Sequence, residues 1–226
     1  MSESMTKRGR PADPALQEVR KQELIDAAYE LLRHSSYRRI TIRDLAREAG
    51  TQSAMIKYYF GDKQGLFLAM LEQVARQHLC AFQALLSAPD PIKAFIETTL
   101  QFFANNPSII RLVTDEVLQG DSPLRQAFLD MLPKRMAVLL PELIMAQQRL
   151  GLMRKDMDPK WVAFSLINLI LTPFIIAPER KEVWTISDAE LCSSRWAAHI
   201  YQLFTLGVTL DTTLGVPLGV SAGVRP

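Results

Sequence analysis

The side chains best suited to chemistry lie between residues 35 and 60. Five of them are basic and two are acidic, which gives this segment a local net charge of +3: Arg38, Arg39, Arg43, Arg47 and Lys57 against Asp44 and Glu48. Next to Lys57 stand Ser53, Tyr58 and Tyr59, whose hydroxyl groups can bond phosphate oxygens or reach base edges. This mixture of basic, hydroxyl and aromatic side chains indicates a surface that binds nucleic acid.

The sequence lacks the short motifs that mark common catalytic and phosphate-binding sites. P-loop, GxSxG, HExxH, GxGxxG and CxxC patterns are all absent. Neighbouring carboxylates such as Asp115 and Glu116 fit a solvated helix face better than an acid–base pair. No metal-ligand spacing relates the histidines and cysteines, which are His34, His78, His199, Cys80 and Cys192. We therefore expect neither an enzyme nor a protein with a metal ion or cofactor.

Two short helices must position the residues between 41 and 60. Thr41 can cap the first, with Asp44 three residues later as its capping-box partner, and Gly50 supplies the stop. Thr51 or Gln52 then begins the second helix, which Gly61 and Asp62 end. Helix-turn-helix proteins place the second helix of such a pair in the major groove of DNA, because the tight turn makes it protrude.

The rest of the chain also predicts helices, and no alternating run indicates a strand, so the fold class is all-α. A first helix spans 16–34, a long helix runs from 63 to about 86, and five more lie near 90–104, 107–119, 123–150, 159–176 and 187–207. Pro133 and Pro141 interrupt the 123–150 stretch, so it is either kinked or two helices. We divide the chain into a basic flexible arm (1–15), a helix-turn-helix domain (16–65), a larger helical domain (66–208) and a loose tail (209–226).

The stretch TIRDLAREAGTQSAMIKYYFGDKQGLF resembles the DNA-binding domain of the TetR family of bacterial transcriptional repressors. The similarity covers roughly residues 16–70. The matching residues stand in the family's order and spacing: Thr41, Arg43, Leu45, Ala46, Ala49, Gly50, Ile56, Tyr58, Phe60, Lys63 and Leu66. The resemblance implies a bacterial, cytoplasmic, homodimeric DNA-binding protein whose helical C-terminal domain binds a small-molecule effector and forms the dimer.

The resemblance also implies a role for each residue of the DNA-binding surface. Thr41 contacts a phosphate, Arg43 reaches a base edge or a phosphate, and Lys63 binds a phosphate at the start of the long helix. The second helix of the motif and its start carry the other residues expected to contact DNA, which are Thr51, Gln52, Ser53, Ala54, Met55, Lys57, Tyr58 and Tyr59. The family more often has Ser at position 52, which moves the expected cap to Thr51. It usually has Tyr at position 57, so Lys57 adds electrostatic affinity and changes the inherited sequence preference.

Several of these residues have simpler interpretations. Ile56 and Phe60 belong to the core, and one of Tyr58 and Tyr59 is expected to face the groove while the other packs. Lys63 has the alternative of a solvated lysine. The arm sequence Arg8-Gly9-Arg10-Pro11 resembles the core of an AT-hook, which inserts Arg into narrow A·T-rich minor grooves, but solvated disorder is the favoured interpretation.

The effector site is expected to be an apolar pocket between helices of the C-terminal domain. Its candidate residues are Phe102, Phe103, Arg111, Phe128, Met131, Phe164 and Asn168. Arg111 pairs either with an anionic ligand group or with Asp115 one helical turn on. Asn168 is a candidate buried polar residue that lines the pocket or sets the register of a subunit interface. The helices near 159–176 and 187–207 are expected to form a four-helix dimer interface, as family likeness implies.

Charge and hydropathy agree with a DNA-binding protein outside the membrane. The net charge is only +2, but residues 1–65 hold twelve basic and nine acidic residues, whereas the remainder holds fourteen and fifteen. The basic excess therefore lies in the helix-turn-helix half. The most apolar run, 161–177, is short for a membrane span and contains polar residues and a proline, so we expect a buried helix. The N-terminus has no apolar leader, which favours the cytoplasm. A helical binding module for protein partners remains the alternative function.

Overall fold

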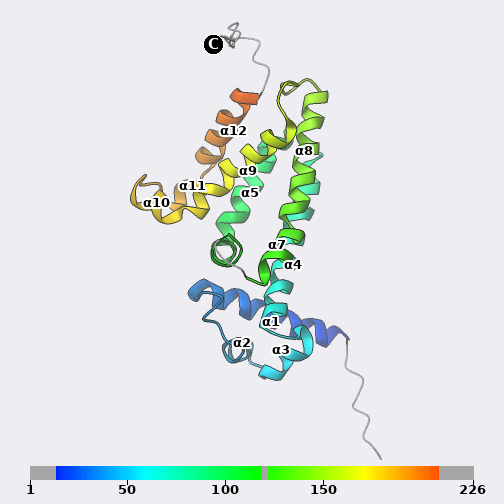
Figure 1. Cartoon of the computed structure of the whole chain (residues 1–226), viewed down its shortest axis with the longest axis vertical. Coiled ribbons are helices and arrows are strands. Elements are labelled where there is room, and N and C mark those ends of the chain that lie inside the picture. The colour runs from blue at the N-terminus through cyan, green and yellow to red at the C-terminus, as the bar shows by residue number, and fades with distance from the viewer. Residues whose placement is uncertain (1–13, 119–121, 209–226) are drawn as a thin grey trace, which may run out of the picture.

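The computed structural model describes residues 14–118 and 122–208, and all regular structure in these ranges is helical (Figure 1). This confirms the all-α prediction. The predicted basic arm as far as residue 13 and the predicted tail from residue 209 lie outside the described residues. Pro14 and Ala15, placed in the arm by the sequence, already belong to the first helix.

The N-terminal part is a small helical domain built on one apolar core. Its elements are α1 (Pro14–His34), α2 (Ile42–Glu48), α3 (Ser53–Phe60) and the first half of α4 (Lys63–Leu85). Leu24, Leu45, Ile56 and Phe67, one from each of these helices, are fully buried together. The same core also takes in Ile109, Leu112 and Leu124, which come from later helices. The N-terminal domain is therefore packed onto the rest of the chain and not separated by a linker.

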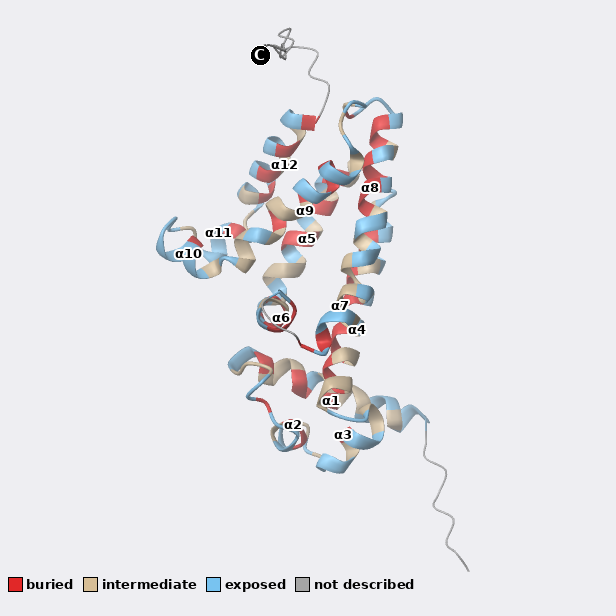
Figure 2. Ribbon diagram, viewed as in Figure 1, coloured by how far each residue is buried: buried red, intermediate tan, exposed pale blue. Residues whose placement is uncertain are grey.

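The C-terminal part is a helical bundle around a second core. Its elements are α5 (Pro91–Asn105), α6 (Pro107–Val113), a π-helical turn η1 (Thr114–Leu118), α7 (Leu124–Met131), α8 (Pro133–Arg149), α9 (Pro159–Ile175), α10 (Ala177–Glu182), α11 (Asp188–Leu191) and α12 (Ser194–Val208). Phe82 from α4, Phe95 from α5, Ile144 from α8 and Leu166 from α9 meet in this core (Figure 2). The end of α4 thus belongs to one core and its beginning to the other.

The structure decides one alternative that the sequence left open and changes several predicted helix boundaries. The 123–150 stretch is two helices, because α7 ends at Met131 and Pro133 starts α8, while Pro141 lies inside α8. The predicted helix 107–119 changes to a π-helical turn after Val113. The predicted helix 187–207 is interrupted after Leu191, and α10 was not predicted. The cap of α3 falls on Gln52 and not on Thr51, and its side chain makes no capping hydrogen bond.

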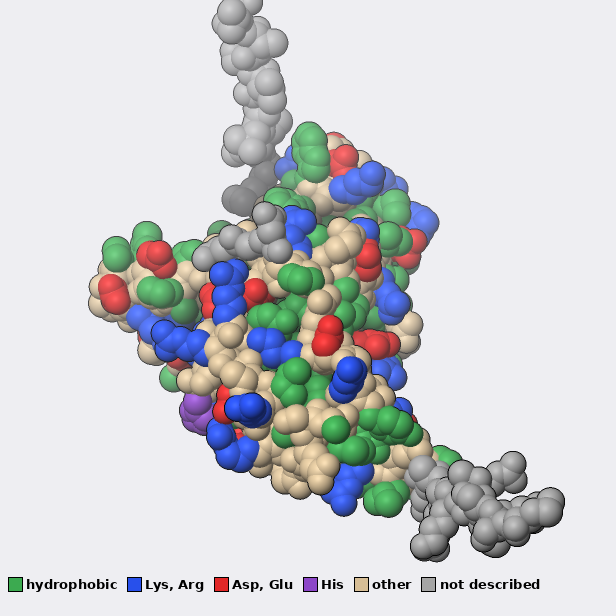
Figure 3. Space-filling model, turned by 60° about the horizontal axis from the view of Figure 1, so that its bottom comes forward, with side chains coloured by type: hydrophobic (Ala, Val, Ile, Leu, Met, Phe, Trp, Pro, Cys, Tyr) green, Lys and Arg blue, Asp and Glu red, His purple; other side chains and the backbone are tan. Residues whose placement is uncertain are grey.

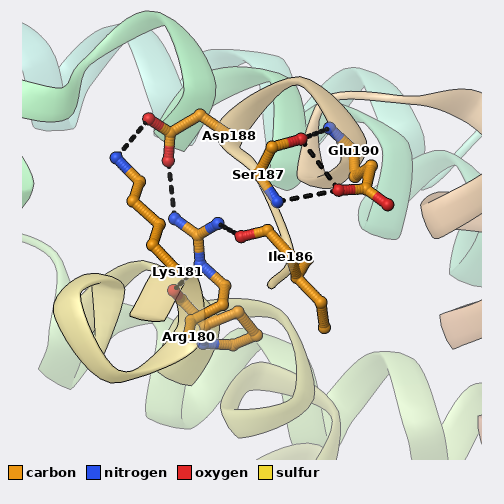
Figure 4. Close-up of polar contacts among 7 residues, drawn as sticks. Arg180, Lys181, Ile186, Ser187, Asp188 and Glu190 are labelled. Carbon is orange, nitrogen blue, oxygen red and sulfur yellow. Dashed lines mark hydrogen bonds and ion pairs between the residues drawn. The ribbon is translucent and has the colours of Figure 1, made fainter. Parts of the chain in front are cut away.

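Helices α10 and α11 form a short projection beside α12 (Figure 1). A buried arginine holds it in place (Figure 4). Only 3% of Arg180 is exposed, and its guanidinium donates to the carbonyls of Pro173 and Ile186 and to the Asp188 carboxylate. Hydrogen bonds from Lys181 and Arg180 hold the pKa of Asp188 below its usual range. Ser187 and Glu190 add a capping box at the start of α11. These polar contacts connect α10 to the end of α9 and to the start of α11.

In residues 14–118 and 122–208, no helix has the length and apolar character needed to cross a bilayer. Within the same residues, no group of three or more His, Cys, Asp and Glu side chains is arranged to hold a metal ion. Cys80 and Cys192 are both exposed free thiols.

Candidate nucleic-acid interface

Local interactions fix the geometry of α2, the turn and α3. The Thr41 hydroxyl accepts a hydrogen bond from the Asp44 backbone N–H at 3.2 Å, and the Asp44 carboxylate accepts from the Thr41 N–H at 3.0 Å, which completes the predicted capping box. Gly50 adopts a φ of 60°, a left-handed conformation that favours glycine, and lets the chain turn sharply. The Thr51 N–H then bonds the Ala46 carbonyl at 2.8 Å. This turn sets α3 against α2 and exposes one face of α3.

The outer face of α3 carries most of the residues that the sequence predicts to contact DNA. Gln52, Ser53, Ala54, Lys57 and Tyr58 are exposed, and Tyr58 is 67% exposed. Two other predicted residues are half-buried, because Met55 and Tyr59 pack against the N-terminal core. The tyrosine on the outer face is therefore Tyr58, and its ring lies edge-on to Tyr59 with 4.9 Å between centroids. Thr51 is half-buried in the turn.

Unpaired positive charge accompanies this face. Arg43 and Lys57 are exposed, and no ion pair joins either of them to a carboxylate in the described part of the chain. Arg47, by contrast, pairs with Asp44 at 2.7 Å. Hydrogen bonds from Thr41 hold the pKa of Asp44 below its usual range, so this carboxylate stays ionised and keeps Arg47 occupied. Figure 3 shows Lys and Arg side chains spread over this end of the molecule among apolar and uncharged ones.

Thr41 and Lys63 are more involved in the protein's own structure than the sequence indicated. The Thr41 hydroxyl donates to the Asp44 carboxylate at 2.7 Å, so its proton is already used within the capping box. The Lys63 ammonium donates to the carbonyls of Tyr37 and Ile40, both at 3.0 Å, and lies 4.2 Å from the centre of the Tyr37 ring. Burial lowers the pKa of Lys63, with the Glu116 carboxylate acting in the opposite direction. Lys63 is thus not a solvated lysine but fixes the loop before α2.

Replacing Lys63 with Met is expected to lower the free energy of unfolding by about 1–2 kcal/mol, because two carbonyls lose a charged donor. The matched replacement is Lys57→Met, which removes an exposed lysine without a partner and should change stability by less than about 0.5 kcal/mol. Urea denaturation followed by circular dichroism measures both. Equal stability of the two variants would contradict the structural role of Lys63.

Comparison with known proteins agrees with this geometry. Residues 24–70 match the model for bacterial regulatory proteins of the tetR family, and residues 89–205 match the model for the tetracyclin repressor-like C-terminal domain. The second match alone covers more than half of the chain. The chain belongs to the TetR family. It is accordingly a DNA-binding transcriptional regulator, and the family and the relatives that it matches are transcriptional regulators.

Individual relatives are similar to part of this chain in sequence and to most of it in fold. The HTH-type transcriptional regulator BetI of Agrobacterium fabrum is 32% identical over 90 residues, which are 38% of this chain and 44% of that protein. The match therefore spans less than half of this relative. The fatty acid degradation regulator FadR from Bacillus halodurans has a TM-score of 0.71 at 16% identity, over 88% of this chain and 98% of that one. FadR from Bacillus subtilis, solved with stearoyl-CoA, has a TM-score of 0.70 at 15% identity, over 82% and 98%.

In this TetR-family chain, α6 and η1 contact the DNA-binding domain through polar side chains. The Arg111 guanidinium donates to the carbonyls of Leu32 and Ser35 at the end of α1, so the predicted pairing with Asp115 is wrong. The Glu116 carboxylate is buried and accepts from Arg38 at 2.9 Å. Asn106 accepts a hydrogen bond from the Tyr29 hydroxyl. Because the segment of Arg38 leads directly to Thr41, these contacts tie the position of α2 to α6.

The predicted effector residues are distributed over both cores and the surface. Phe102, Phe128 and Met131 pack against the N-terminal core, whereas Phe103 packs in the C-terminal core, 5.5 Å from the Phe174 ring. Phe164 lies on the exposed face of α9. Asn168 is half-buried and donates to the Phe164 carbonyl of its own helix at 2.8 Å, so it is not the fully buried residue that the sequence indicated.

One polar side chain that sequence reasoning did not select stands out in the C-terminal domain. His78 on α4 is buried, its Nδ1 has no hydrogen-bond partner among the described residues, and its ring centroid lies 4.4 Å from that of Phe102. Burial lowers the pKa of His78 to about 4. In the sequence, His78 stands one helical turn from Ala75 and follows the spacing of the apolar residues of α4. This spacing is typical of a core residue.

Proposed function

We propose that the chain is a homodimeric repressor that binds a palindromic operator and is released by a small, largely apolar effector bound in the C-terminal domain. The observation that carries this proposal is the exposed, cationic outer face of α3, supported on a buried core at a fixed angle to α2. Ser53, Lys57 and Tyr58 on this face read the operator, while Arg43 and the first turn of α2 contact its backbone. Lys63 supports the loop and directs its remaining N–H toward a phosphate.

The dimer is proposed to form through α9 and α12. Large apolar side chains are exposed on both helices, which pack against each other: Trp161, Phe164, Leu203 and Leu206. A patch of this kind on one face of a protein marks a protein–protein contact. Two chains joined there present two α3 helices to one duplex, and the symmetry of the dimer requires a palindromic site.

Release by an effector is supported by the contacts that connect the two domains. Ile109, Leu112 and Leu124 complete the N-terminal core, and Arg111 and Glu116 hold α1 and the following loop. A ligand that moves α6 or α7 therefore also moves the support of α2 and α3. The apolar character of the effector is supported by the fold, which in FadR from Bacillus subtilis accommodates stearoyl-CoA.

The proposal is tested by selecting binding sites from a random oligonucleotide pool with the purified full chain. An enriched palindrome is expected, and a pool without an enriched motif would instead favour a helical binding module for other partners. On the selected site, Lys57→Met should weaken binding and reduce the slope of log K against log salt by about 0.9 for each copy of Lys57 in the dimer, because each copy releases counterions from one phosphate. Fluorescence anisotropy over a salt series measures this slope. Because Lys57→Met is expected to leave stability unchanged, an unaltered slope would remove Lys57 from the interface.

A further inference from the structure

A groove between α4 and α8 combines an apolar wall with positive charge. It has a volume of about 580 Å³, within the range of small-molecule sites. Its apolar wall consists of Leu79 from α4 and Val138 and Leu139 from α8. Arg76 stands on the α4 side and Lys134 and Arg135 on the α8 side. The groove thus places cations from two helices around one apolar surface.

Two of these three cations have no partner of their own. Lys134 pairs with the Asp130 carboxylate one turn earlier in sequence. Neither Arg76 nor Arg135 makes a hydrogen bond or an ion pair within residues 14–118 and 122–208. Arg20 and Arg33 on α1, by contrast, each pair with a glutamate three residues away. The groove therefore has an uncompensated positive charge on both of its walls.

We propose that this groove binds a free, single-chain anionic amphiphile. Its apolar part lies on Leu79, Val138 and Leu139, and its anionic head is held between Arg76 and Arg135. A guanidinium donates two parallel N–H groups to a carboxylate, and this pairing is stronger beside apolar surface than in open water. A neutral ligand of the same shape leaves both guanidinium groups unpaired, and a cationic one is repelled.

The groove lies on the helix that connects the two cores. Helix α4 contributes Phe67 and Met70 to the N-terminal core and Arg76 and Leu79 to the groove, two to three turns further along. A ligand between α4 and α8 therefore contacts the element that supports the DNA-binding domain. As an account of the effector, this inference rests on the proposed function, but the binding site itself can be tested without DNA.

The test compares three probes with the same twelve-carbon chain: laurate, dodecanol and dodecyltrimethylammonium. Isothermal titration calorimetry of the full chain, with each probe below the concentration at which it aggregates, is expected to show laurate binding about tenfold or more tighter than dodecanol, and no binding of the ammonium probe. The double variant Arg76→Gln, Arg135→Gln should lose this preference for laurate. The control is Arg149→Gln, which removes an exposed arginine of α8 outside the groove and should bind laurate like the unchanged protein.

Equal affinity for laurate and dodecanol, or a preference for laurate that survives in the double variant, would overturn the proposal. Both outcomes are independent of DNA, so the site stands or fails separately from the repressor function. Laurate that binds in the groove without lowering affinity for the selected operator would confirm the site and remove the groove as the effector site. All variants change exposed side chains, and circular dichroism checks that each one folds.

Discussion

Phe164→Glu should separate the proposed dimer into monomers and weaken binding to the full operator by about 100-fold or more. Phe164 is 70% exposed on α9, and α9 and α12, which pack together, also carry the exposed side chains of Trp161 and Leu206. A glutamate there brings its charge into the proposed interface twice, once from each chain, and each carboxylate must give up water to enter it. A single helix-turn-helix domain then contacts only one half-site and loses the gain from two linked contacts.

The matched control is Leu150→Glu, which changes a residue of the same 70% exposure at the end of α8. Sedimentation velocity gives the oligomeric state, and fluorescence anisotropy gives the affinity for the full site and for a half-site. Leu150→Glu should remain dimeric. If Phe164→Glu also remained dimeric, the interface would lie elsewhere, whereas a monomer with unchanged affinity would mean that one chain suffices to bind the operator.

The helix-turn-helix elements could be predicted because short-range interactions determine them. Thr41 and Asp44 form the capping box within one helical turn, Gly50 takes the conformation that its sequence position required, and Asp62 caps α4 through the Gly65 N–H. The alternation of exposed and buried residues on α3 also follows from helical period, which identified Ile56 as core. Signals of this kind are complete within a few residues, so a single sequence contains them.

Contacts between distant segments could not be predicted. The family resemblance assigns a phosphate contact to Lys63 at the start of α4. It does not indicate that the Lys63 ammonium also reaches back to the carbonyls of Tyr37 and Ile40. Arg111 bonds the end of α1, more than seventy residues earlier, in preference to Asp115 one turn on. Nothing in the spacing of charges indicates a backbone carbonyl as the partner, because every residue has one.

For a related reason, the sequence could not predict where the candidate effector residues lie relative to one another. Aromatic and Met residues at helical spacing identify an apolar face, but the packing of the helices decides whether that face meets a core, a groove or another chain. Phe103 meets the C-terminal core and Phe128 the N-terminal one, while Phe164 meets solvent in the single chain. Helix α10 was missed because its sequence, APERKE, has no apolar period, and the buried bonds of Arg180 hold it in place.

Lowering the pH from 7.5 to 5.0 should reduce the free energy of unfolding by about 2 kcal/mol through His78 alone. Only 6% of this residue is exposed, and burial lowers its pKa to about 4, against 6.5 in the unfolded chain. Between these two values the unfolded chain binds a proton that the folded chain does not. The free energy of unfolding therefore rises with pH across this window. The loss of stability caused by His78 disappears above pH 6.5.

The decisive measurement is the difference between the unchanged protein and His78→Leu in urea denaturation at the two pH values. Leucine does not titrate and leaves no unpaired nitrogen beside Phe102, so the variant should be as stable as the unchanged protein at pH 7.5 and more stable than it at pH 5.0 by about 2 kcal/mol. Carboxylates such as Asp44 and Asp188 also lose stabilising contacts in acid, but they do so equally in both proteins and cancel in the difference. The control His199→Gln changes an exposed histidine of α12 and should keep the acid sensitivity of the unchanged protein. If His78→Leu lost as much stability in acid as the unchanged protein, the His78 ring would have to be protonated in the folded chain at pH 5.0. Its Nδ1 would then need a hydrogen-bond acceptor.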